Sequence, residues 1–176
     1  METSPSAHAD RVSRLSASFE EANGRLIARL RGAADGLAER VPAEGWSAAQ
    51  IGWHVAAVST RFAGMISGDI TAAQPLPPDF KERDWDEVTA AIPERAESPA
   101  AVAPPPGVAR DAAVTALEGS GAAMARALAT LTEERGARMG ITHRVVGAIT
   151  VFQIGEWAVS HVMRHNRQAK RVLGES

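Results

Sequence analysis

Hydrophobic residues recur in alternating steps of four and three along four separate segments of this chain. That spacing places apolar side chains on one face of an α-helix. It predicts helices over about 8–31, about 48–67, about 111–131 and about 151–173. No strand-like alternation and no internal repeat is evident. We therefore predict an all-α fold, a four-helix bundle in which each helix turns its apolar face to a shared core.

The predicted helix boundaries coincide with residues that favour helix ends. Ser47 is followed by Gln50, and Thr150 by Gln153, and each pair has the spacing of a capping box. These pairs predict where the second and fourth helices begin. Asp111 is the predicted cap of the third helix. Gly68 and Gly174 are predicted to end the second and the fourth helix.

A proline-rich crossover, residues 67–107, separates the second helix from the third. Its prolines exclude a long helix, and only a short one is expected, capped by Asp84 and ending at Ile92 before Pro93. A connection of this length either crosses the bundle or covers a site, or else it is a disordered tether. Residues 135–147 are expected to be extended or turn-like. The whole chain, 1–176, is predicted to be a single domain with its core within about 8–173.

Composition excludes several classes of function. The chain has no cysteine, so disulfides, cysteine-ligated zinc, iron–sulfur clusters and a cysteine nucleophile are ruled out. Its 19 basic and 21 acidic residues show no basic excess, so we expect no nucleic-acid partner. A polar start and the lack of a run of about 18 apolar residues predict a cytoplasmic protein without a membrane partner.

Three histidines carry the strongest chemical signal. His161 and His165 are four residues apart, which puts both imidazoles on one face of the fourth helix. His54 lies in the second helix beside Val55 of the apolar stripe. His54 taken alone is more typical of a partly buried helix-face residue bonded to a carbonyl, and the spacing of His161 and His165 can also arise by chance. Facing helices of a bundle can nevertheless build a metal site together.

Three short stretches resemble the DinB/YfiT-like superfamily. They are Trp46–His54, with a tryptophan, a helix cap and a histidine; His143–Thr150, before the fourth helix; and His161–Gln168, with the histidine pair. Members of that superfamily are four-helix bundles with a divalent-metal site. The resemblance implies that His54, His161 and His165 are the metal ligands. The crossover departs from the family pattern in its length and proline content.

Neighbouring residues have candidate supporting roles. Gln168 can orient an imidazole or touch substrate, Trp157 can line the pocket, and Arg61 can bind a carboxylate. Each also has a plain alternative: a solvated helix end, core packing and a surface arginine, respectively. Four basic residues at the end of the fourth helix either attract an acidic substrate or complement the helix dipole: Arg164, Arg167, Lys170 and Arg171. His8 and His143 are predicted not to be ligands.

The predicted chemistry follows from the ligand types. Three neutral imidazoles leave coordination positions open, and they suit a divalent transition metal such as Zn, Ni or Fe. The resemblance implies an enzyme that uses a low-molecular-weight thiol and a small-molecule electrophile, as an S-transferase or isomerase. Arginine supplies every basic residue except Lys81 and Lys170, a bias typical of GC-rich coding, which favours mycothiol as the thiol.

Two other functions remain open at this point. One is a metal-dependent hydrolase, and the other is a non-catalytic bundle that binds metal or a small ligand, or forms a stress-related homodimer. An acyl-transfer triad is not indicated, because no serine has a glycine-flanked elbow. Glu156 lies about 140° around the fourth helix from His161, so paired-carboxylate chemistry has no support either.

Overall fold

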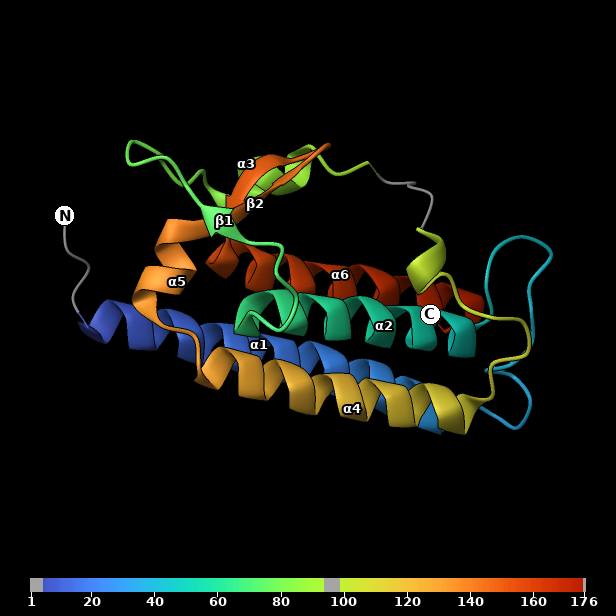
Figure 1. Cartoon of the computed structure of the whole chain (residues 1–176). Coiled ribbons are helices and arrows are strands. Elements are labelled where there is room, and N and C mark those ends of the chain that lie inside the picture. Colours follow the sequence, from blue (N-terminus) through green and yellow to red (C-terminus); the bar gives the residue numbers. More distant parts are fainter. Residues whose placement is uncertain (1–4, 94–98, 176) are drawn as a thin grey trace.

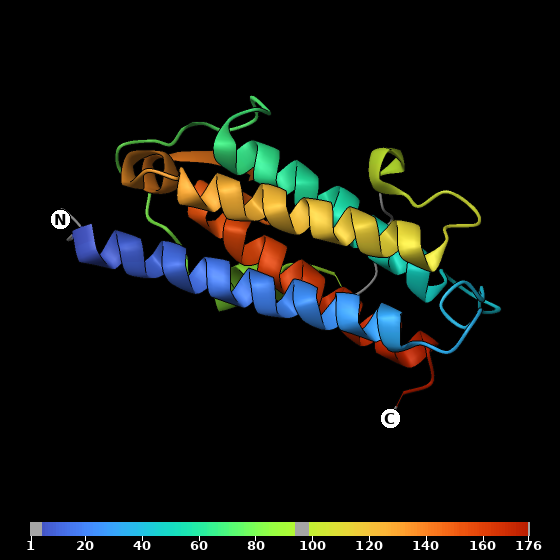
Figure 2. The same ribbon diagram turned by 90° about the horizontal axis from the view of Figure 1, so that it is seen from below.

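A computed structural model describes residues 5–93 and 99–175. Four long helices run side by side along the molecule: α1 (Pro5–Gly32), α2 (Ala48–Ser67), α4 (Arg110–Ala129) and α6 (Val151–Val172) (Figure 1). Helices α1 and α2 each pack against both α4 and α6. The view from below shows the same four helices in two layers (Figure 2).

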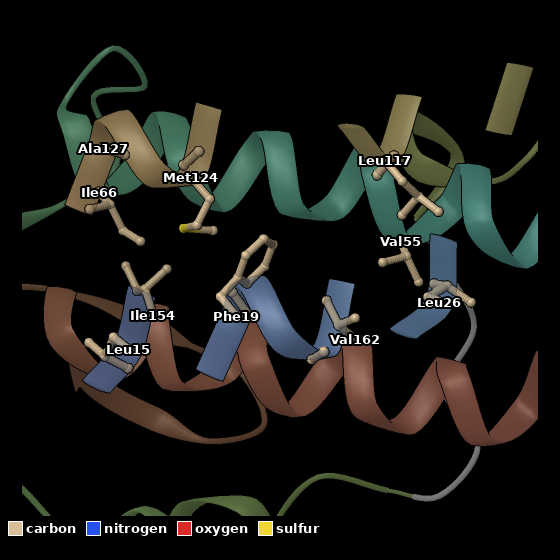
Figure 3. Packing of buried hydrophobic residues seen from close by; sticks show 14 of the residues in the cluster. Leu15, Phe19, Leu26, Val55, Ile66, Leu117, Met124, Ala127, Ile154 and Val162 are labelled. Carbon is tan, nitrogen blue, oxygen red and sulfur yellow. The ribbon is translucent and has the colours of Figure 1, made fainter. Parts of the chain in front are cut away.

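The core lies between these helices. Figure 3 shows Phe19 of α1, Val55 of α2 and Val162 of α6 pointing into the shared interior. The predicted apolar face of α6 is wrong in part, because Met163 is 47% exposed whereas Val162 is fully buried. Helix α6 carries apolar residues on more than one face, so periodicity alone did not separate Met163 from the buried positions, whereas Ile149 and Phe152 of the predicted face are buried. No described helix is long and apolar enough to cross a membrane.

Local sequence signals set most helix boundaries. Both predicted capping boxes are present, at Ser47 before α2 and at Thr150 before α6. Gly68 ends α2 in the left-handed conformation, with a φ of 97° that favours glycine.

The predicted cap of α4 is wrong. Ala109 occupies the N-cap position and makes no side-chain cap bond, while Asp111 lies in the first turn. The free Arg110 amide instead donates to Glu39 Oε1 at 2.8 Å. An acceptor that is distant in sequence thus satisfies this helix end.

The described parts of the crossover lie against the helices. It contains a two-residue strand, β1 (Gln74–Pro75), a short helix, α3 (Trp85–Ala90), and a 3₁₀ turn, η1 (Ala100–Val102). Asp84 caps α3 as predicted, although the helix ends at Ala90 rather than Ile92. Trp85 Nε1 donates to Ser160 Oγ of α6 at 3.0 Å, so a side-chain hydrogen bond attaches α3 to α6.

The expectation of a purely α-helical chain needs correction. Strand β1 pairs with β2 (Met139–His143), which pairs with β3 (Gly147–Thr150), in a small antiparallel sheet. A short helix, α5 (Glu133–Arg138), precedes β2 and overlaps the start of the segment expected to be extended or turn-like. Strands of two to five residues contain too few alternations to reveal their period. The fold is therefore mostly helical with a three-stranded sheet.

The middle strand of this sheet requires glycine at position 140. A methyl group there would overlap the Ile149 carbonyl oxygen and lie 2.9 Å from the Leu76 methyls. We expect Gly140→Ala to lower the free energy of unfolding by about 1–3 kcal/mol, as overpacking does. Gly119→Ala is the matched control. Gly119 is an exposed position of α4, and an added methyl group there meets nothing within 4 Å. That variant should gain about 0.5–1 kcal/mol. Urea unfolding measures both, and equal effects would contradict the requirement for glycine at position 140.

Candidate metal centre

Packing of α2 against α6 brings the three predicted histidines together. The two helices run in opposite directions, so the first half of α2 lies beside the second half of α6 (Figure 1). One nitrogen each of His54, His161 and His165 lies within 4.8 Å of the others. Their ring centroids are 4.4–5.1 Å apart. The group has the size and donor chemistry to hold one metal ion.

Two of the imidazoles are oriented by hydrogen bonds to oxygen. His54 Nδ1 lies 2.8 Å from the carbonyl oxygen of Val102, and His165 Nδ1 lies 2.8 Å from Gln168 Oε1. Both partners are acceptors, so each Nδ1 carries the proton and donates it. The proton-free Nε2 of each ring is then the available ligand atom, an arrangement typical of metal-binding histidines.

The third imidazole has an unsatisfied nitrogen. His161 Nδ1 is buried and has no hydrogen-bond partner among the described residues. Buried polar atoms are nearly always paired, because a lost hydrogen bond with water is costly. A metal ion bound by the three histidines would supply the partner that this imidazole nitrogen lacks.

Burial keeps all three rings in the form that binds metal. It lowers the pKa of His54 and lowers that of His161 well below its usual value, and the neighbouring histidines lower the His161 pKa further. Burial, together with His54, lowers the pKa of His165 to about 4. The imidazoles are therefore neutral near pH 7, and a neutral ring has a lone pair to share.

The crossover supplies a contact that the sequence did not reveal. The Val102 carbonyl in η1 orients His54, and Pro105 O accepts a bond from Gln50 Nε2 at 3.0 Å. Backbone carbonyls have no residue signature, so only the tertiary structure identifies them. Trp46 lies with its ring centroid 4.9 Å from that of His54. The histidine group thus has an aromatic neighbour at the start of α2.

The other candidate residues lie at different distances from the group. Gln168 contacts His165 directly. Trp157 does not; its ring packs against Phe62, which in turn lies 6.4 Å from His161 between centroids. Arg61 is exposed on α2.

The basic run at the end of α6 has two parts. Arg164 Nη1 donates to the Pro93 carbonyl at 3.0 Å, which attaches the crossover to this helix. Lys170 and Arg171 occupy the last turn, where cations complement the helix dipole.

The two remaining histidines lie outside the group. His143 is in β2 and accepts a bond from the Val145 amide. His8, expected at a frayed terminus, lies within α1 and packs against Phe152. Two surface cavities of about 260 and 250 Å³ flank Arg11 of α1, and neither is lined by the three-histidine group.

The architecture and site define a helical protein whose packed helices carry a three-histidine group. A family model of the DinB superfamily matches residues 18–169, which include all three histidines. The chain belongs to the DinB superfamily. No functionally curated protein matches it in sequence.

Removing one imidazole should abolish tight metal binding. We expect His161→Ala to reduce bound zinc from about one ion per chain to a small fraction, because two imidazoles hold a tetrahedral ion weakly. Elemental analysis of untagged protein after reconstitution with zinc measures the number of ions bound per chain. Trp85 lies in the crossover and contacts α6 through Ser160. Trp85→Leu is the control and should keep the full zinc content. Equal zinc in wild type and His161→Ala would contradict the assignment.

The metal-free protein should become less stable as the pH falls from 7 to 5. Unfolded histidines bind protons near pH 6.5, whereas the folded protein resists protonation of these three rings. The unfolded chain therefore binds more protons, and stability falls by up to about 1.4 kcal/mol per pH unit for each such histidine. Urea unfolding at each pH measures the slope. His161→Gln should show a shallower slope, and an unchanged one would contradict this assignment.

Proposed function

We propose that this chain is a four-helix-bundle metalloenzyme that transfers a low-molecular-weight thiol, such as mycothiol, to a small electrophile, or isomerises it through such an addition. The supporting observation is the ligand set itself: three neutral imidazoles, with no carboxylate joining them among the residues that the structure describes. When bound, a divalent transition metal supplies positive charge that lowers the pKa of an adjacent thiol or water. Three protein ligands leave room for that exchangeable group.

The chain's own residues hold and orient this centre. His54, His161 and His165 supply the nitrogens. Val102 and Gln168 fix two of the rings by accepting their Nδ1 protons. Because both acceptors are neutral, no negative charge from them offsets the charge of the ion, and an anionic sulfur is favoured as the next ligand.

Thiol chemistry fits the surroundings better than hydrolysis does. A hydrolase of this type uses a carboxylate as a general base for water. Helix α2 has no acidic residue, and the only one in α6 is Glu156. The Glu156 carboxylate is bound by Arg11 of α1 at 2.8 Å. A thiol would not need such a base, because a metal ion held by the three histidines would lower its pKa. The chain has no cysteine to compete with it.

A spectroscopic experiment tests the open coordination position. The protein is loaded with Co²⁺, and its visible and near-ultraviolet spectrum is followed as 2-mercaptoethanol is added. We expect a saturable new sulfur-to-cobalt band, while ethylene glycol, its oxygen counterpart, should leave the spectrum unchanged. His54→Ala should lose both the cobalt spectrum and the response to thiol.

The other outcomes identify the alternatives. A cobalt spectrum that the thiol does not change would contradict the thiol proposal. If added hydroxide alone changes that spectrum, a hydrolase is favoured. If neither does, the three histidines form a closed binding site, and the chain is a metal-binding bundle. A positive response is followed by an assay of thiol transfer from 2-mercaptoethanol to 1-chloro-2,4-dinitrobenzene, with and without metal.

A further inference from the structure

A row of aromatic rings leads from the histidine group to the tip of the β2–β3 hairpin. His161 and Phe62 have centroids 6.4 Å apart, Phe62 and Trp157 5.7 Å, and Trp157 and His143 5.0 Å. These residues come from α6, α2 and β2, three elements that only the tertiary structure brings together. Phe62 and Trp157, the two middle members of the row, belong to the phenylalanine and tryptophan residues that make up 5% of the chain.

The rings of the row are not simply part of the interior. Phe62, Trp157 and His143 are each only partly buried, whereas the core faces of the same helices are closed by residues such as Val55 and Ile154, which are fully buried. The row therefore offers partly open ring surface that begins beside a metal-ligand candidate. Aromatic rings stack with flat unsaturated groups in preference to saturated ones.

The far end of the row is polar and has a defined proton. The Val145 amide donates to His143 Nδ1 at 3.2 Å, so that nitrogen holds a lone pair. The neutral ring then carries its proton on Nε2. Nε2 makes no hydrogen bond to another described residue. It is free to donate to an oxygen of a bound molecule.

We propose that Phe62, Trp157 and His143 form the acceptor-binding wall of the site. The acceptor they select is a flat, conjugated compound that carries a carbonyl-type oxygen. Its unsaturated body lies on the Phe62 and Trp157 rings, and its oxygen accepts a hydrogen bond from His143 Nε2. The end of the bound molecule away from this oxygen then points along the row toward Phe62 and His161. The inference rests on the proposed function for its role in catalysis, but the binding preference exists without it.

Calorimetry with two matched probes tests the wall. Cinnamamide is flat and conjugated, and 3-cyclohexylpropanamide has the same amide on a puckered, saturated body. We expect the zinc-loaded protein to bind cinnamamide at least tenfold more tightly. Phe62→Leu and Trp157→Leu should reduce that preference to less than threefold. Trp85→Leu removes a partly buried tryptophan away from the row and should leave the preference unchanged.

Two variants separate the hydrogen bond from the ring contacts. His143→Leu should weaken cinnamamide binding about fivefold to tenfold, and His143→Gln, which keeps an N–H donor, should restore it to within about threefold. Equal affinity for the two probes, or a loss as large in Trp85→Leu as in Trp157→Leu, would overturn the proposal. Zinc content is measured on every sample. Lack of zinc in wild type contradicts the proposed function, whereas full zinc without a preference for cinnamamide contradicts the wall alone.

Discussion

The packing of α2 against α6 brings three imidazoles together, His54 buried and His161 and His165 partly buried. The rest of the site depends on how the loss of water around these rings is compensated. A buried polar group costs free energy unless it finds a partner. His54 finds the Val102 carbonyl, and His165 finds Gln168, while the pKa of each ring is lowered so that the cost of a buried charge is avoided. One nitrogen of His161 is left without a described partner. The packed helices thus place three neutral nitrogen donors within 4.8 Å of one another.

The crossover is part of this compensation rather than a simple connection. Val102 and Pro105 accept bonds from α2, and Pro93 accepts one from α6. Nearer the start of α6, Arg11 binds both Glu82 of the crossover and Glu156 at 2.8 Å. Thr150, the cap of α6, also donates to Glu82 at 2.7 Å. The length of the crossover lets it contact α6 both at its start, through Thr150, and in its second half, through Arg164.

The sheet positions a second set of side chains beside the histidines. Strand β1 comes from the crossover and pairs with β2, which in turn pairs with β3 directly before α6. This pairing holds the β2–β3 hairpin so that the His143 ring meets the Trp157 ring edge to face. The histidine group and the aromatic row therefore share α6 as a scaffold. A site built on helices and a paired strand is held more rigidly than one built on loops.

The sequence alone determined the long helices, both capping boxes and the spacing of His161 and His165, because these depend on residues three or four apart along one helix. It also indicated His54, whose place beside the apolar stripe follows from the same period. Only the tertiary structure decided which face of α6 is buried, that Glu39 satisfies the start of α4, and that three short strands form a sheet. It also decided that Val102 orients His54 and that His143 meets Trp157. These features are contacts between segments far apart in the chain, and several use backbone atoms that every residue possesses, so no local pattern of side chains can encode them.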